Sequence, residues 1–214
     1  TRQALEKVLK KDLGYVSAAR SKNQGEYTLE DYYALPDEQR VELIDGVIYD
    51  MAAPTFVHQR LIGVIFTQIV IGIDKKRGNC IPMLSPVDVR LDCDDRTMVQ
   101  PDVLILCDQS KIRRWGIDGA PDFVLETLSD SPKRKECILK LHKYADAGVK
   151  EYWIIDPFSK KLITYDFREE IVPHIYPLEG EVGLAIYDGE LKVDLERLAE
   201  VIQDWPDTNN PYKE

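Results

Sequence analysis

The chain has 214 residues, of which 44% are hydrophobic and 31% are charged, and its formal net charge is −10 at pH 7. This length supports one sizeable hydrophobic core and argues against two full domains. The acidic balance counts against an extended nucleic-acid-binding surface, because sequence-independent affinity for DNA comes from lysine and arginine facing phosphates. A local basic strip, such as the KRK at 133–135, could still bind a nucleic acid.

Several classes of protein are disfavoured by composition. The cysteines at 80, 93, 107 and 137 are widely spaced, which suggests neither a disulfide framework nor a thiolate zinc site and fits a reducing compartment. The three histidines lack the spacing of a zinc hydrolase, so any metal would be held by oxygen. No run approaches the roughly 18 apolar residues of a membrane span, and no secretory core is present. We therefore expect a cytoplasmic protein with no membrane partner.

The first part of the chain is predicted to be helical. Apolar residues at helical spacing in residues 1–20 predict an amphipathic helix, followed by a polar linker at 21–26. Thr28 with Asp31 three residues later is a variant of the capping box. This pattern predicts a short helix that ends at Pro36.

A hairpin and a long helix are predicted next. Asp45-Gly46 lies between two β-rich runs and predicts a type I′ turn, which needs positive φ at both central residues. The run from 56 to 73 is apolar on most sides and of helical length. Such a helix is expected in the core or at an oligomer interface, and on this basis we expect a homodimer.

The remaining elements alternate between strands and helices. A helix is expected to begin at Ser131-Pro132 and to end at about Ala147, before Gly148. A closing helix is expected at 194–203. Strands are predicted within 80–92, 99–108, 121–129, 151–167 around an Asp-Pro turn, and 184–193 around an Asp-Gly hairpin at 188 and 189.

This order predicts an α+β or mixed α/β domain with helices packed on a central sheet. We expect a helical extension and linker in residues 1–25, one domain in residues 26–203 and a disordered tail in residues 204–214.

Glu126 is the first candidate functional residue. Strand alternation places it on one face with Val124 and Leu128, where an unpaired carboxylate would cost several kcal/mol. It would need a cation or a metal, or a raised pKa. The alternative is an edge-strand glutamate that reaches water.

Asp102 heads a second apolar run, directly after Pro101, which marks the beginning of the strand. The alternative is an ordinary turn or cap. Asp122 also follows a proline, but it lies four residues before Glu126, about 13 Å away at roughly 3.3 Å per residue. That distance is too long for one shared divalent ion, whereas Asp102 and Glu126 on neighbouring strands could converge.

Lys140 lies at the border of the core-facing arc of the helix that follows, beside Tyr144. It could lean towards the sheet and compensate Glu126. The alternative is a lysine that extends along the helix surface to water.

Several motifs resemble a bacterial endonuclease family known as Uma-two, within the PD-(D/E)XK nuclease superfamily. The similarity covers about residues 27–200 and rests on motifs in the same order. These are VELIDGVIYDM at 41–51, HQ at 58–59, SPVDVRL at 85–91, QPDVLILCD at 100–108, GAPDFVLETLSDS at 119–131 and LKLHKYADAGVKEYWIIDP at 139–157.

The resemblance implies a restriction-endonuclease-like core and a set of site residues. Asp102 and Glu126 match the Mg²⁺ ligands, and Glu42 matches an early acidic residue of the first hairpin. Leu128 occupies the usual place of the lysine that supports the attacking water, and Lys140 on the next helix is the matching position. Glu136 could position Lys140 or bind a second ion. His58 also matches a family motif, although a core histidine is the alternative reading.

The implied function is hydrolysis of phosphodiester bonds in nucleic acid, in the first place DNA, with Mg²⁺ or, as a substitute, Mn²⁺. One alternative is a nuclease-fold protein that no longer cleaves and acts as a dimeric binding or scaffold module. Another is a hydrolase of small phosphorylated molecules.

Overall fold

The structure is a computed structural model that describes residues 22–36, 38–91, 94–128 and 133–204, with the backbone alone at 133–138. The predicted helix at 1–20, the predicted cap at 131 and 132 and most of the predicted tail lie outside the described residues. The division into an extension, one domain and a tail therefore stays a prediction.

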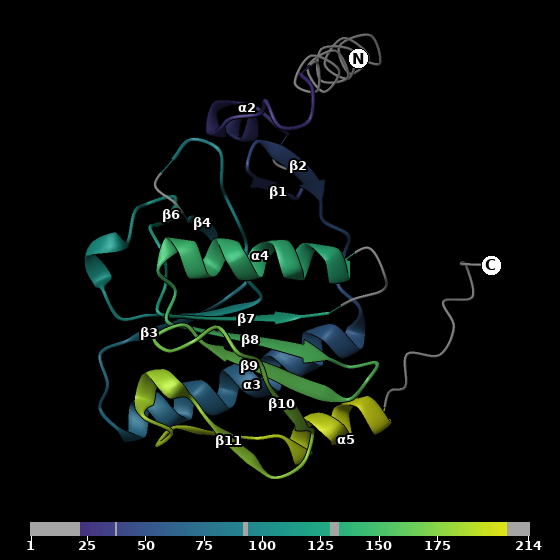
Figure 1. Ribbon diagram of the computed structural model, residues 1–214, viewed down its shortest axis with the longest axis vertical. Helices are drawn as coiled ribbons and strands as arrows, with labels where there is room; N and C mark the ends of the chain where they lie inside the picture. The colour runs from purple at the N-terminus through teal and green to yellow at the C-terminus, as the bar shows by residue number, and fades with distance from the viewer. Residues whose placement is uncertain (1–21, 37, 92–93, 129–132, 205–214) are drawn as a thin grey trace, which may run out of the picture.

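A six-stranded mixed sheet forms the centre of the molecule (Figure 1). Only β7 and β8 pair in parallel, and the other neighbouring strands are antiparallel. In spatial order the strands are β10 (His174–Pro177), β9 (Lys161–Asp166), β8 (Glu151–Asp156), β7 (Phe123–Thr127), β5 (Val103–Leu106) and β3 (Ile81–Leu84).

Smaller elements surround this sheet. Three two-stranded pairs are β1 (Val41–Ile44) with β2 (Val47–Asp50), β4 (Asp88–Arg90) with β6 (Gly116–Asp118), and β11 (Glu181–Gly183) with β12 (Lys192–Asp194). The described helices are α2 (Leu29–Tyr33), α3 (Phe56–Lys75), α4 (Lys133–Ala147) and α5 (Glu196–Asp204), with short 3₁₀ turns η1 (Gln109–Lys111) and η2 (Ala185–Tyr187). The predicted mixed α/β class is confirmed.

Helices cover both faces of the sheet, with α4 on one face and α3 and α5 on the other (Figure 1). Strand alternation explains this arrangement on β7, all of whose residues are buried. Phe123 and Leu125 pack into the core on the α3 side, whereas Val124 packs into the core on the α4 side. Because α4 connects the two parallel strands, it is the crossover helix and lies directly over β7 and β8.

Helix α3 is the one described helix long and apolar enough to cross a membrane, with a mean hydropathy of 1.6 and 39% of that window buried. Seven of its residues are buried, and these pack on the sheet and on α5 and β12. Its core-facing side is therefore covered by the chain itself. The homodimer and the cytoplasmic location stay predictions.

The N-terminal elements form as predicted. The Asp31 carboxylate accepts a hydrogen bond from the Thr28 N–H at 2.8 Å, which completes the capping box of α2. Asp45 and Gly46 have φ values of 51° and 77°, as the turn between β1 and β2 requires. Leu43 of β1 exchanges backbone hydrogen bonds with Met98, so the hairpin is tied to the segment that leads into β5.

The predicted strand at 184–187 is wrong. Residues 185–187 form the 3₁₀ turn η2, and Asp188 and Gly189 end it with φ values of 52° and 75°. The hairpin strands are β11 and β12, on either side of this longer connection. The 3₁₀ turn prevails because it lets the Ile186 N–H donate to the buried Glu151 carboxylate at 2.9 Å.

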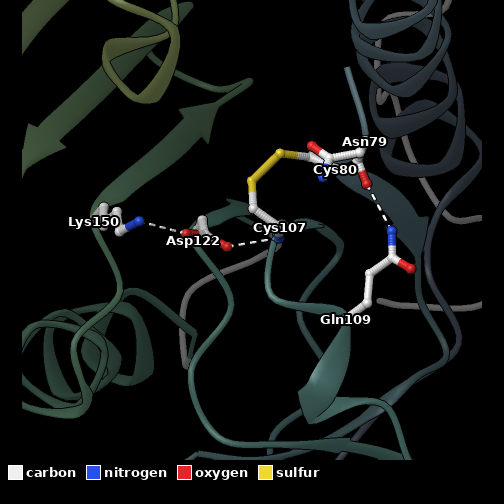
Figure 2. Close-up of a disulfide and its surroundings, with 6 residues drawn as sticks. All are labelled: Asn79, Cys80, Cys107, Gln109, Asp122 and Lys150. Atoms are coloured by element: carbon white, nitrogen blue, oxygen red, sulfur yellow. Dashed lines mark hydrogen bonds and ion pairs between the residues drawn. A yellow bond between two sulfur atoms is a disulfide. The ribbon is translucent and has the colours of Figure 1, made fainter. Parts of the chain in front are cut away.

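The expectation of no disulfide is also wrong, because Cys80 and Cys107 form one (Figure 2). These cysteines are 27 residues apart, but Ile81 pairs with Leu106, so the two cysteines are the next pair across β3 and β5. Asp122 accepts a hydrogen bond from the Cys107 N–H at 2.7 Å and forms an ion pair with Lys150 (Figure 2). The side chains of Cys93 and Cys137 lie outside the described residues.

Candidate active site

Two predicted carboxylates lie side by side on adjacent strands. Val103 pairs with Leu125 in the antiparallel β5–β7 ladder, so Asp102 lies opposite Glu126 at the next position. Asp102 is fixed there because its Oδ2 accepts a hydrogen bond from the Thr127 N–H at 2.7 Å. Both carboxylates are buried, so the edge-strand alternative for Glu126 does not apply.

Glu42 reaches the same region from the N-terminal hairpin. In β1, Leu43 packs into the small core under α2, whereas Glu42 shares the opposite face with Ile44, which belongs to the core on the α4 side. The Gln100 N–H donates to Glu42 Oε1 at 2.8 Å. The hairpin's attachment at Met98 thus brings the third carboxylate beside the segment that leads into β5.

Lys140 enters this group of carboxylates from α4. Its Nζ lies 2.7 Å from Glu42 Oε2 and 2.9 Å from Glu126 Oε1, and the residue is 5% exposed. Tyr144, one helical turn later on the same face, donates its hydroxyl to Glu126 Oε1 at 2.8 Å. The alternative in which Lys140 extends to water is therefore wrong.

Burial and like charges act together on Glu126. Burial is the largest cause that raises the pKa of its carboxyl, to about 7, and the nearby Asp102 and Glu42 add to the rise while Lys140 opposes it. Burial disfavours the charge of Lys140, but Glu126 and Glu42 raise its pKa above the ordinary value. Two buried carboxylates, Glu42 and Glu126, thus contact one ammonium, and the buried Asp102 lies opposite Glu126, which leaves an excess of negative charge.

His58 contacts the site, which sequence reasoning left as the less favoured reading. It lies in the first turn of α3, where Thr55 caps the helix by accepting the His58 N–H. Its Nε2 is 3.0 Å from Asp102 Oδ2. Its Nδ1 is buried and has no hydrogen-bond partner among the described residues. The histidine is therefore a contact of a candidate ligand as well as part of the helix that packs on the sheet.

Gln100 connects the site to a second polar group that sequence reasoning missed. Its side-chain Oε1 accepts from Arg40 at 3.0 Å, and its Nε2 donates to Asp88 Oδ1 at 2.9 Å. Tyr32 donates to the same Asp88 oxygen at 2.9 Å. The hydrogen-bond partners of Gln100 come from three separate segments of the chain, which no local sequence pattern brings together.

Comparison with known proteins is decisive for the family. A family model described as "Uma2: Putative restriction endonuclease" matches residues 29–205. The chain belongs to the Uma2 family. A solved structure described as a putative nuclease belonging to DUF820, from Anabaena variabilis ATCC 29413, is similar in fold, with a TM-score of 0.66 and 22% sequence identity. The match covers 82% of this chain and 98% of that one. No curated protein matches.

Asp122, the rival carboxylate weighed in the sequence analysis, stands apart from this candidate active site. Asp122 lies at the other end of β7, where it binds the Cys107 N–H and Lys150. This placement agrees with the argument that it cannot share an ion with Glu126. The Glu136 side chain lies outside the described residues.

The free oxygens of the candidate active site bear on metal binding. Among the described residues, no three His, Cys, Asp or Glu groups lie close enough together to hold one ion. Glu42 uses both oxygens on Lys140 and Gln100. In the described part of the chain, Asp102 Oδ1 and Glu126 Oε2 accept no hydrogen bond. Two oxygen donors with surplus negative charge fit a hard divalent cation such as Mg²⁺ or Mn²⁺.

Proposed function

We propose that this chain is a metal-dependent endonuclease that hydrolyses phosphodiester bonds in nucleic acid, in the first place DNA. The observation that carries the proposal is the insertion of Lys140 from α4 between the buried carboxylates of Glu42 and Glu126, with Asp102 opposite Glu126 on the adjacent strand. Family membership supports the nuclease class. A buried excess of negative charge has no evident use in stabilising a sheet, because it destabilises the folded state.

In this proposal Asp102 and Glu126 hold the ion through their free oxygens. A bound Mg²⁺ or Mn²⁺ would polarise the phosphoryl oxygens and lower the pKa of a bound water. Glu42 can become a third ligand only by exchanging part of its contact with Lys140. In this proposal Glu42 mainly holds the Lys140 ammonium, and it contributes to metal binding only secondarily.

The chain's own residues would act on the water and on the transition state. Lys140 would orient the attacking water and offset the negative charge that develops on the phosphorus oxygens. Tyr144 fixes Glu126 Oε1, which leaves Oε2 for the ion. His58 would hold Asp102 in orientation through the 3.0 Å contact between its Nε2 and Asp102 Oδ2.

A second candidate is a silent, dimeric scaffold protein with a nuclease fold. The observation that favours it is the closed arrangement in which Lys140 satisfies both Glu42 and Glu126 without a metal. A thermal-shift titration with Mn²⁺ separates the two functions. The endonuclease proposal expects a rise in Tm that is lost in Asp102→Asn, whereas the scaffold expects no rise.

Cleavage of supercoiled plasmid with Mg²⁺ or Mn²⁺ tests the enzyme directly. We expect nicking by the wild type and a loss of about 10²-fold or more in Glu126→Gln. Asp122→Asn removes a buried carboxylate from the other end of the same strand and is the matched control. Equal nicking by wild type and Glu126→Gln would refute the site assignment.

A further inference from the structure

A cavity of about 390 Å³ lies beside the β4–β6 pair, within the size range of small-molecule pockets. Its lining combines apolar, basic and aromatic side chains. The residues that matter here are Met83, Asp88, Ile112, Arg113, Arg114 and Trp115. None of them is among the residues assigned to catalysis above.

Large aromatic side chains are exposed on this part of the surface. Trp115 is 41% exposed and Tyr33 is 52% exposed. Tyr33 packs edge-on against Tyr32, whose hydroxyl donates to Asp88 in the wall of the cavity. Gly116, next to Trp115, pairs closely with Asp88, because a Cβ at position 116 would lie 2.2 Å from the Asp88 carbonyl oxygen. The β6 strand could not approach β4 this closely with another residue there.

Basic side chains surround the tryptophan in an otherwise acidic chain. The sequence KIRRWGID at 111–118 contains three basic residues and one acidic residue. Lys111 donates to the Ala120 carbonyl at 2.8 Å, and Arg113 lies 3.5 Å from Asp118. Arg114 is exposed and makes no hydrogen bond or ion pair with any residue that the structure describes. One guanidinium next to Trp115 is therefore available for an anion.

The cavity is connected to the candidate active site by a single residue. Gln100 donates through its side chain to Asp88 in the cavity wall, at 2.9 Å. The same residue donates through its backbone N–H to Glu42, at 2.8 Å. Asp88 in the cavity wall therefore lies two hydrogen bonds away from Glu42, which contacts Lys140.

We propose that this cavity binds an unpaired nucleobase of a DNA strand, stacked on Trp115, with the adjacent phosphate on Arg114. The assignment of DNA rests on the proposed function. Stacking on exposed aromatics beside a cation is the usual way proteins bind single strands, because every base has a π-face. A base within a duplex has both faces covered by its neighbours, so only an unpaired base fits. Asp88 supplies a carboxylate acceptor for N–H groups at the edge of the base.

Binding of a fluorescein-labelled single-stranded oligodeoxynucleotide to the full chain tests the proposal. Anisotropy is measured in EDTA, so that cleavage plays no part. We expect Trp115→Ala to raise Kd about tenfold and Trp115→Phe to restore most of the affinity. Arg114→Ala should lower the slope of log K against log salt by about 0.7. Phe158→Ala and Arg197→Ala, exposed residues on other elements, are the matched controls and should bind as the wild type does.

An oligonucleotide of abasic sites separates the base from the phosphate. We expect its binding to be insensitive to Trp115→Ala and still sensitive to Arg114→Ala. A fully paired duplex should bind without dependence on Trp115. Unchanged Kd in both Trp115→Ala and Arg114→Ala, or equal dependence of duplex binding on Trp115, would overturn the proposal.

The two proposals fail separately. If plasmid nicking depends on Glu126 but single-strand binding is unaffected by Trp115→Ala, the base-pocket proposal is refuted and the endonuclease proposal stands. If single-strand binding depends on Trp115 but no nicking is seen, the endonuclease proposal is refuted and the base-pocket proposal is supported.

Discussion

Lys140 and Glu126 lie 2.9 Å apart, and neither is exposed by more than 7%. The charge of each residue offsets the cost of burying the other, because a buried ion pair must recover the free energy of desolvation through close contacts. Glu42 and Tyr144 complete these contacts. The consequence at the residue scale is that removal of Lys140 leaves Glu42 and Glu126 buried without their cation.

Lys140→Met should lower both stability and activity. It leaves two buried carboxylates without their cation, so we expect a loss of about 3–5 kcal/mol in the free energy of unfolding, measured by urea denaturation. Plasmid nicking should fall about 10²-fold. Lys143→Met is the control on the same helix, because its ion pair with the half-exposed Asp45 should contribute less than about 1 kcal/mol.

The position of the cation can also be moved. Leu128 directly follows β7 and packs in the core on the α4 side, and the resemblance described above implies that a lysine usually occupies this position. We expect Leu128→Lys to recover part of the nicking lost in Lys140→Met. No recovery in a double variant that folds, as shown by circular dichroism, would contradict the idea that the strand and helix positions are equivalent.

The stability of the metal-free protein should depend on pH through Glu126. Burial raises its pKa from 4.5 to about 7, so the folded state binds this proton more tightly than the unfolded state does. The free energy of unfolding should therefore fall as pH rises from about 4.5 to about 7, and then level off. Calorimetry in EDTA should show Tm falling by several degrees more in the wild type than in Glu126→Gln. Parallel Tm curves for the two proteins would count against a raised pKa.

At the scale of elements, local patterns predicted most of the sheet and helices. The capping box at Thr28, the Asp45-Gly46 turn and the glycine after α4 each specify a boundary by local geometry. The convergence of Asp102, Glu126 and Lys140 was also predicted, from strand alternation and the resemblance together. The connection at 184–191 was not, because the hydrogen bond from Ile186 to Glu151 joins residues 35 positions apart. The hydrogen bonds of Gln100 were not predicted for the same reason, since its partners come from distant segments.

Two isoleucines on α3 test whether this helix serves the core or an interface. Ile69 is fully buried and Ile71 is 46% exposed. We expect Ile69→Ala to lose about 2–5 kcal/mol of unfolding free energy and Ile71→Ala to lose less than about 1 kcal/mol. Sedimentation of both variants checks the predicted homodimer. A shift to monomer in Ile71→Ala alone would place the exposed side of α3 at the dimer interface.

At the scale of the whole molecule, the sheet determines which distant residues meet. The wide spacing of the cysteines along the chain argued against a disulfide. That argument failed because the antiparallel pairing of β3 and β5 brings distant residues together. The same pairing that brings Cys80 to Cys107 continues to Ser85, whose N–H donates to the Asp102 carbonyl at 3.0 Å. The edge strand β3 is thus joined to β5 by the disulfide at one end. At the other end it is joined by a backbone hydrogen bond to Asp102, a candidate metal ligand.

The Cys80–Cys107 bond also encloses the exposed residues 94–96. A protease that cuts after Arg96 would divide the polypeptide into two pieces that the sulfur bridge still joins. Limited trypsin digestion should therefore give one full-length band on a denaturing gel without thiol, and two shorter bands after thiol is added. Two bands in both lanes would mean that the bridge had not formed. With the bridge in place, this chain can be severed in its middle and still migrate as a single molecule.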